Sequence, residues 1–249
     1  MACGPPVTGA TGKLRCAGHN PAMGTLYLIR HGQASFGAAD YDQLSELGAR
    51  QCHALGQYFA ERGVQFEAVL RGTLRRHVQS LSALKDGYAS ALPTAIPAAL
   101  EWPGLNEYDS EAIIRTVHSG PLAAPDSPEV YRAHFRLLRQ GLAAWMAGTT
   151  APVGMPSYAQ FVAAINAALD HVRSQHSGNV LLVSSGGPIS TAVGQVLGTS
   201  AETTIELNLR IRNSALTEFA FTPKRHMLVS YNHVPHLDLP GRAAWVTFA

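Results

Sequence analysis

Cysteine, charge and long apolar runs are all scarce in this chain, and each scarcity excludes a class of protein. The three cysteines, Cys3, Cys16 and Cys52, lack metal-ligand spacing, and such an odd, sparse set favours reduced thiols and a cytoplasmic protein. No apolar stretch reaches the roughly 18 residues of a membrane span, so no membrane association is expected. Nineteen Lys and Arg against 17 Asp and Glu leave a net charge of +2, which predicts no general affinity for nucleic acid.

Hydrophobic residues, in contrast, are plentiful. They make up 46% of the 249 residues, which is enough for a large buried core. Residues 1–22 differ from the rest, because they are rich in Gly, Ala, Pro and Thr and show neither helical nor strand periodicity. We predict a flexible N-terminal extension over residues 1–22 and a single domain over residues 23–249. An ordered N-terminal arm is the alternative.

Strand and helix patterns alternate along the predicted domain. Apolar runs predict strands at residues 26–29, 68–70, 93–97, 180–183, 215–221 and 227–231. Helical spacing and capping residues predict helices at residues 45–62, 73–88, 127–146 and 157–175, and one that contains Pro188 in its first turn and ends near Leu197. This alternation predicts an α/β fold of three layers, α/β/α, with a doubly wound, mostly parallel sheet.

Polar residues follow three of the predicted strands. Arg30 and His31 end the first strand, and Arg76 lies where a helix begins after the second. Ser185 and Gly186 follow the central strand, also at a helix start. Ligands bind outside the carboxyl ends of the strands in open α/β sheets, helix N-termini favour anions, and arginines hold phosphate by forked hydrogen bonds. The pattern indicates an anion site that contains a histidine, although ordinary polar turns and a solvated Arg76 would give the same residues.

Longer segments around these positions are more specific. In chain order the sequence contains Leu28-Ile29-Arg30-His31-Gly32, Leu44-Ser45-Glu46-Leu47-Gly48 with Gln51, Gly72-Thr73-Leu74-Arg75-Arg76-His77-Val78-Gln79-Ser80, Leu105-Asn106-Glu107 and Val183-Ser184-Ser185-Gly186-Gly187. These five segments resemble, in the same order, the motifs of the histidine phosphatase superfamily, which has the phosphoglycerate mutase-like fold. The resemblance covers nearly all of the chain from Met23 onward.

The resemblance implies roles for individual residues. His31 would be the nucleophile that carries a phosphoryl group, and Glu107 would be the general acid and base. Arg30 and Arg76 would clamp the phosphate, together with Ser185 and Gly186. Two other carboxylates near Glu107 compete for the acid role, namely Glu101 and Asp109. In such folds the insertion at residues 101–156 would shape the choice of substrate.

The chain departs from the family pattern at Ser185, where the family has a second catalytic histidine. A serine hydroxyl donates a neutral hydrogen bond, roughly half as strong as the charge-assisted bond of a histidinium. One hypothesis is a weakly active or non-catalytic protein that binds a phosphorylated ligand. The other is that another cation compensates, and His236 is then the candidate, since the family often has His-Leu near this end.

A phosphomonoester hydrolase with a phosphohistidine intermediate is the predicted function. Phosphoglycerate mutase-type phosphotransfer is the alternative, and residues 33–41 argue against it because they lack the Asn and Trp of the glycolytic mutases. The expected partner is a small phosphorylated substrate, and no cofactor or metal is expected, because the spacing of His226, His233 and His236 matches no familiar metal site. The oligomeric state stays open, with a dimer as one alternative.

Overall fold

A six-stranded sheet forms the centre of the structure. The structure is a computed structural model that describes residues 23–35, 42–121 and 127–248. The strands lie in the order β3 (Ala99–Glu101), β2 (Ala68–Arg71), β4 (Asn179–Ser184), β1 (Gly24–Arg30), β5 (Leu216–Thr222) and β6 (Arg225–His233). The first four are parallel to one another, and β5 is antiparallel to both of its neighbours. The mostly parallel sheet predicted from the sequence is confirmed, whereas the predicted extension over residues 1–22 lies outside the described residues.

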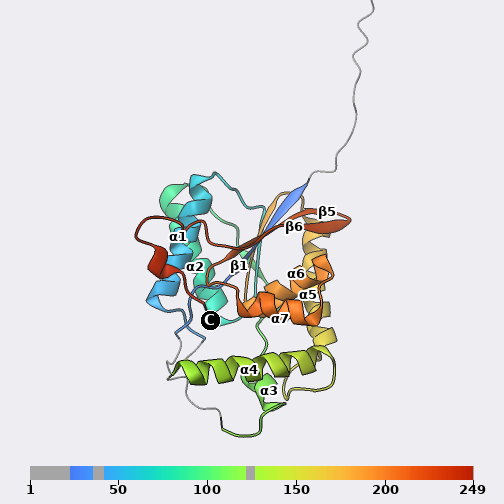
Figure 1. Cartoon of the computed structure of the whole chain (residues 1–249). Helices are drawn as coiled ribbons and strands as arrows, with labels where there is room; N and C mark the ends of the chain where they lie inside the picture. Colours follow the sequence, from blue (N-terminus) through green and yellow to red (C-terminus); the bar gives the residue numbers. More distant parts are fainter. Residues whose placement is uncertain (1–22, 36–41, 122–126, 249) are drawn as a thin grey trace, which may run out of the picture.

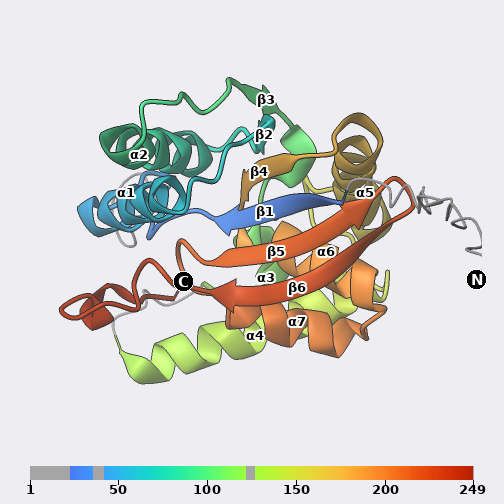
Figure 2. The ribbon, with the colours of Figure 1, turned by 90° about the horizontal axis from the view of Figure 1, so that it is seen from above.

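Helices cover both faces of this sheet (Figures 1 and 2). On one face lie α1 (Glu46–Glu61) and α2 (Arg75–Ala91). The other face is covered by α3 (Ser110–Arg115), α4 (Pro128–Met146), α5 (Tyr158–Gln175), α6 (Gly186–Leu197) and α7 (Ala201–Leu209). Successive strand residues divide between the two cores, so that Leu182 packs on the α5 and α6 side and Val183 on the α1 side. This is the predicted three-layer α/β/α arrangement.

The register of the central strands places the polar strand ends together. β1 pairs with β4 so that Arg30 lies opposite Ser184, and β4 pairs with β2 so that Val183 lies opposite Arg71. The apolar residues of β1 and β4 are buried on both faces, which is why these strands read as continuous apolar runs. The residues that follow the three strands therefore lie close together, beyond the carboxyl ends of these strands.

Most helix boundaries follow their capping residues. Ser45 accepts a hydrogen bond from the backbone of Gly48 at the start of α1, and Ser127 caps α4 in the same way. Ser157 and Gln160 form a complete capping box at the start of α5. These are the starts that the sequence predicted.

One predicted strand was wrong, and two short helices were not predicted. The strand predicted at residues 93–97 is a loop, and β3 begins at Ala99 instead, since prolines at both ends of that segment lack the N–H that a sheet needs. The helices α3 and α7 were not predicted, because they span only 6 and 9 residues and show no clear period. Two short 3₁₀ turns complete the described elements, at Pro103–Leu105 and Ala243–Trp245.

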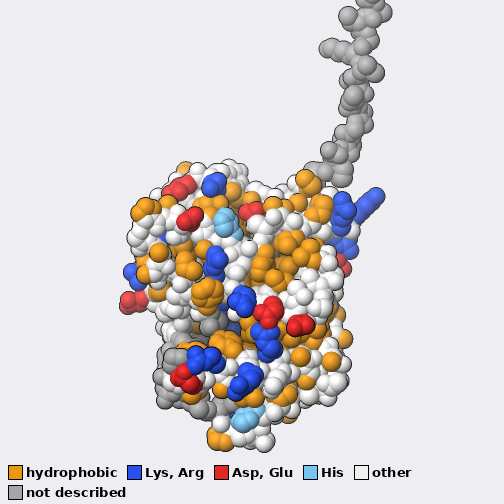
Figure 3. Space-filling view, viewed as in Figure 1, with side chains coloured by type: hydrophobic (Ala, Val, Ile, Leu, Met, Phe, Trp, Pro, Cys, Tyr) orange, Lys and Arg blue, Asp and Glu red, His pale blue; other side chains and the backbone are white. Residues whose placement is uncertain are grey.

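The surface carries charges of both signs. Figure 3 shows Lys and Arg side chains interspersed with Asp, Glu and hydrophobic side chains on the face viewed in Figure 1. Within the described ranges, no helix combines the length and apolar character that crossing a membrane requires.

Candidate functional site

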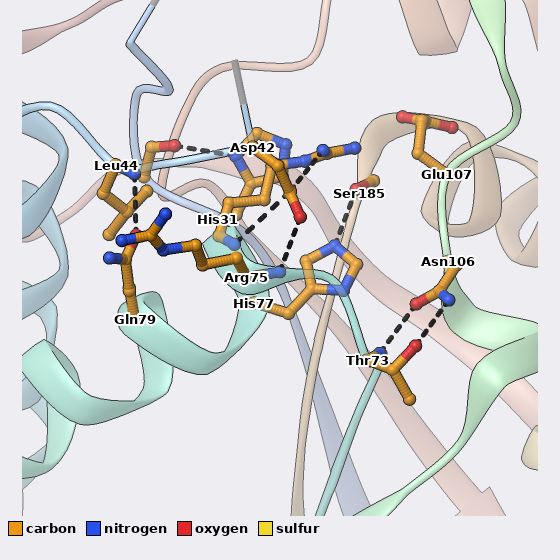
Figure 4. Close-up of polar contacts among 12 residues, drawn as sticks. His31, Asp42, Leu44, Thr73, Arg75, His77, Gln79, Asn106, Glu107 and Ser185 are labelled. Carbon is orange, nitrogen blue, oxygen red and sulfur yellow. Dashed lines mark hydrogen bonds and ion pairs between the residues drawn. The ribbon is translucent and has the colours of Figure 1, made fainter. Parts of the chain in front are cut away.

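The ends of β1, β2 and β4 bring the predicted site residues together. Arg30 closes β1 and His31 follows it, while Ser185 follows β4 and α2 starts shortly after β2. Figure 4 shows His31, His77, Ser185 and Glu107 grouped near these strand ends, with His77 and Ser185 joined by a hydrogen bond. The grouping follows from the strand order, because β4 lies between β1 and β2.

The His31 imidazole is buried, neutral and held in one orientation. It is 4% exposed, and its Nδ1 lies 2.7 Å from the carbonyl oxygen of Gly32. Burial, and then the charges of Arg30 and Arg76, hold the pKa of His31 well below its ordinary value. Since a carbonyl can only accept, Nδ1 carries the proton and Nε2 keeps its lone pair. A neutral imidazole with a free Nε2 lone pair is the form that attacks phosphorus.

Close backbone packing holds the turn after His31. A Cβ on Gly32 would lie 2.3 Å from the carbonyl oxygen of Gly48 in α1, so neither glycine has room for a side chain. The N–H of Gly32 donates to Ser80 Oγ at 3.1 Å, and that of Gln33 donates to Gln51 Oε1 at 2.9 Å. Residues of two other family-like motifs therefore position the His31 turn.

Two buried arginines flank His31. Arg30 is 5% exposed and donates from Nη1 to the carbonyl oxygen of Ile211. Arg76 is 8% exposed, and its Nη1 lies 2.7 Å from Oδ1 of Asp42. The neighbouring Arg75 is exposed. The structure thus brings Arg76, and not Arg75, into the interior beside His31.

Glu107 is the carboxylate that lies near His31 and the two buried arginines. Its oxygens accept from the backbone N–H of Gly187 at 3.1 and 3.2 Å. Burial raises the pKa of Glu107, and this effect outweighs the Gly187 hydrogen bond and the charges of Arg76 and Arg30, which lower it. A carboxyl group that keeps its proton longer than usual is suited to protonate a leaving oxygen.

The competing carboxylates have other partners. Glu101 forms an ion pair with Arg71 at 2.6 Å and is exposed, and Asp109 caps α3 through the backbone of Glu111 and Ala112. These contacts support Glu107 as the acid.

His77 is a site residue that sequence reasoning missed. It is fully buried, its ring centroid lies 5.8 Å from that of His31, and its Nε2 lies 2.7 Å from Ser185 Oγ. Burial, with the charges of Arg76 and Arg71, lowers the pKa of His77 to about 3. The available signal was a histidine directly after Arg76, where the family pattern has alanine.

The helix start after β4 leaves no space at either glycine. A Cβ on Gly186 would lie 2.7 Å from Oδ1 of Asn208, and one on Gly187 would lie 2.1 Å from Oε1 of Glu107. The N-terminus of α6 therefore lies directly against the acid segment, with its positive dipole end toward the site.

His236 has a different partner from the one that compensation for Ser185 would require. Its Nε2 lies 2.8 Å from Ser214 Oγ, and the Ser214 N–H donates to the carbonyl oxygen of His31 at 3.0 Å. Burial, together with Arg242 and His233, lowers the pKa of His236 to about 3. His236 thus reaches the His31 backbone through Ser214, and its role as a compensating group stays a prediction.

Among the residues that the structure describes, no three His, Cys, Asp or Glu side chains form a group that could hold a metal ion. The site combines a neutral imidazole, two guanidinium groups and a carboxyl group with a raised pKa. Such a set can transfer a phosphoryl group through the histidine.

Comparison with known proteins agrees with this chemistry. A family model described as the histidine phosphatase superfamily (branch 1) matches residues 26–234. A search of curated proteins finds no significant match.

Several solved structures share the fold. A phosphoglycerate mutase from Bacillus anthracis superimposes with a TM-score of 0.60 at 17% identity, covering 87% of this chain and 96% of that one. A phosphoserine phosphatase from Entamoeba histolytica, in complex with 3-phosphoglyceric acid, gives 0.60 at 18% identity, with coverages of 86% and 98%. A mycobacterial glucosyl-3-phosphoglycerate phosphatase gives 0.54 at 21% identity, with coverages of 84% and 98%.

Proposed function

The chain belongs to the histidine phosphatase superfamily (branch 1), and on that premise we propose that it hydrolyses phosphomonoesters through a phosphohistidine on His31. The observation that carries the proposal is the state of His31: a buried, neutral imidazole with Nδ1 held by Gly32 and two arginines beside it. Arginine charge attracts the phosphate and also keeps the imidazole unprotonated. Both effects favour nucleophilic attack.

The first step forms the phosphoenzyme. His31 Nε2 attacks phosphorus and forms an N–P bond while the bond from phosphorus to the ester oxygen breaks. The leaving oxygen takes the proton of Glu107, whose raised pKa keeps that proton available. Arg30 and Arg76 offset the charge on the equatorial oxygens in the transition state.

The second step returns the enzyme to its starting state. Glu107, now a carboxylate, takes a proton from water as the water oxygen attacks phosphorus. The N–P bond breaks, His31 regains its lone pair, and inorganic phosphate leaves. Each group ends in the protonation state in which it began, so the cycle balances without a cofactor.

The proposed substrate is a small phosphorylated molecule. Two of the similar structures are named as phosphatases, one of phosphoserine and one of glucosyl-3-phosphoglycerate. The insertion at residues 101–156 supplies Glu107 together with α3 and α4, so we propose that it selects the group attached to phosphate.

The test is turnover combined with trapping of the phosphoenzyme. Wild-type protein incubated with p-nitrophenyl phosphate should release phosphate, and acid-labile phosphohistidine should be detected after a rapid quench. His31→Ala should abolish both signals. His176→Ala, a substitution beside Glu67 at the opposite end of β4 from the site, is the matched control and should retain both.

Other outcomes separate the alternatives. Isomerisation of a phosphorylated substrate without net phosphate release would identify a mutase. Phosphate binding without turnover or phosphohistidine, across a broad panel of phosphomonoesters, would identify a non-catalytic binding protein. Either result would overturn the hydrolase proposal.

A further inference from the structure

We infer that Ser185 and His77 act as one hydrogen-bond donor unit for the phosphoryl group. In this unit, His77 Nε2–H donates to Ser185 Oγ, and the Ser185 hydroxyl donates to a phosphoryl oxygen at His31. Ser185 is then the residue that contacts the substrate, and His77 is a positioning residue. This inference rests on the proposed function and deepens it.

The Ser185 hydroxyl departs from what other serines do at helix starts. Ser45, Ser127, Ser157 and Ser200 all occupy N-cap positions, and each accepts a hydrogen bond from its own helix backbone. Ser185 is the N-cap of α6 with the same extended backbone conformation, yet its side chain makes no capping bond. Its oxygen lies 2.7 Å from His77 Nε2 instead. The hydroxyl is therefore directed toward α2 and the site, at the expense of a cap that is usually worth about 1 kcal/mol.

The surroundings of His77 determine which nitrogen carries its proton. Nδ1 is buried and has no hydrogen-bond partner among the described residues. It faces the Cα of Gly72, where an added Cβ would lie 2.2 Å from Nδ1. An unpaired buried N–H costs more than a lone pair that faces a C–H group. The proton is accordingly on Nε2, where it is donated to Ser185.

This tautomer leaves the Ser185 hydroxyl hydrogen available. Because Ser185 Oγ already accepts from His77, its own hydrogen can rotate toward another acceptor. Ser185 is fully buried, and no second hydrogen bond of its hydroxyl occurs within the described residues. The His31 ring, with its centroid 5.8 Å from that of His77, marks where a transferring phosphoryl group would be.

Burial, and after it two nearby positive charges, keep His77 neutral. Arg76 on α2 and Arg71 on β2 both disfavour a positive charge on His77, and the neutral His31 adds none. A neutral imidazole donates a hydrogen bond through Nε2–H, but this N–H is far too weak an acid to give its proton to the substrate. The pair therefore orients a donor and takes no part as an acid.

Four variants of the full chain test the unit, with p-nitrophenyl phosphate as substrate. Ser185→Ala removes the donor, and His77→Asn places an amide near Nδ1 but nothing at Nε2. His77→Gln restores an N–H at about the reach of Nε2. The double variant Ser185→Ala/His77→Asn completes the cycle. His226→Asn alters a partly buried histidine, which packs on Phe219 and Phe221 away from the site, and serves as the control.

We expect Ser185→Ala and His77→Asn each to lower kcat by about 10²-fold with little change in KM, because the donor acts mainly in the transition state. The double variant should lose no more than either single variant, since both act through one hydrogen bond. His77→Gln should recover most of the loss, and His226→Asn should retain wild-type kcat. Additive losses, an unchanged kcat in His77→Asn, or a Gln variant as impaired as the Asn variant would overturn the inference.

Thermal unfolding and vanadate binding keep the result separate from the proposed function. A variant that has lost its cooperative unfolding transition is excluded from the kinetic comparison. If His77→Asn is excluded for this reason, kcat of Ser185→Ala and of His77→Gln tests the inference. If the wild type has no more turnover than His31→Ala, the hydrolase proposal fails while the inference is still tested by orthovanadate affinity. Orthovanadate affinity at least tenfold weaker than that of the wild type in both Ser185→Ala and His77→Asn supports the donor unit, and unchanged affinity overturns it.

Discussion

At the scale of single residues, burial distinguishes two adjacent arginines. Arg76 is buried beside His31, while Arg75 on the same turn is exposed. We expect Arg76→Ala to raise KM and to lower kcat/KM for an aryl phosphate by about 10²- to 10³-fold, the usual cost of losing one donor to a transition-state oxyanion. The matched variant Arg75→Ala should change kcat/KM by no more than a few fold. Steady-state kinetics on both proteins would measure the difference, and equal losses would show that general positive charge, rather than a clamp, binds phosphate.

Glu107 should determine the alkaline limb of the pH profile. Burial raises the pKa of its carboxyl group, so the acid form is retained to higher pH than usual and is lost as the pH rises through that raised value. The rate of phosphoenzyme formation should fall there, because the leaving oxygen is no longer protonated. Glu107→Gln should remove this limb and lower kcat/KM by about 10²- to 10⁴-fold for an alkyl phosphate.

Leaving-group dependence provides the control for Glu107. p-Nitrophenolate needs little protonation, so Glu107→Gln should impair kcat/KM much less for p-nitrophenyl phosphate than for an alkyl ester. A rapid-mixing burst of about one equivalent of nitrophenol is also expected, since the second step loses its base. Equal impairment with both substrates would assign another group as the acid.

The limit of sequence reasoning at this scale is illustrated by His77. Motif spacing favours Arg76 over Arg75 and Glu107 over Glu101, because each choice depends on a short local segment, and in the structure Arg75 and Glu101 are the exposed members of these pairs. The contact between His77 and Ser185 joins residues 108 positions apart. It depends on β2 and β4 being neighbours in the sheet, which no local pattern contains.

At the scale of elements, one close contact between a turn and a helix holds His31 in place. A Cβ on Gly48 would lie 2.2 Å from the carbonyl oxygen of Gln33, in the turn after His31. Gly56, also in α1, would clash equally with the carbonyl oxygen of Leu84 in α2, at 2.0 Å. Gly48→Ala and Gly56→Ala should therefore both destabilise the protein, by about 1–3 kcal/mol as overpacking usually does.

Activity should separate these two glycines. Gly48→Ala displaces the His31 turn and should lower kcat by at least tenfold, because small misplacements of reacting groups are costly. Gly56→Ala changes only the packing of α1 on α2 and should keep kcat near the wild-type value at temperatures where it is folded. Urea unfolding and kcat measured on the same preparations would test this, and parallel losses of activity would contradict it.

Element prediction from the sequence succeeded where capping and burial agree. Ser45 and Ser157 mark helix starts by their side-chain oxygens, and the apolar run of β4 is buried on both faces. The short β3 was misplaced because its three residues are partly or fully exposed, so they have no apolar pattern. The edge of the sheet and the short helix α3 are set by tertiary contacts rather than by their own residues.

At the scale of the whole molecule, the parallel part of the sheet forms the site and the antiparallel part completes its support. β1, β2 and β4 are neighbours in the sheet, so His31, the start of α2 and Ser185 lie together beyond their carboxyl ends. The segments before β5 and after β6 enclose the site from the other side, where Ser214 donates to the carbonyl oxygen of His31 and His236 contacts the Ser214 hydroxyl. Residues as far apart in the chain as Gly32 and His236 thus surround one imidazole.

This burial has a consequence for stability. His31, His77 and His236 are each less than 5% exposed, and burial is the first cause of a lowered pKa in all three. Their folded pKa values lie below the unfolded value of about 6.5. The unfolded chain therefore binds more protons as the pH falls, and the stability that is fully present above pH 6.5 is lost progressively below it, toward about pH 3 for His77 and His236.

We therefore expect the free energy of unfolding to fall steeply between pH 6.5 and 4. Each buried histidine contributes a slope of about 1.4 kcal/mol per pH unit in this window. His236→Asn should reduce the total slope by about one such unit while leaving the slope above pH 7 unchanged, since the wild-type residue is neutral in both states there. Carboxylates add their own pH dependence, but it is common to both proteins and cancels in the comparison. Urea titrations at intervals of half a pH unit would measure it, and identical slopes below pH 6.5 would mean that His236 is not held neutral by the fold.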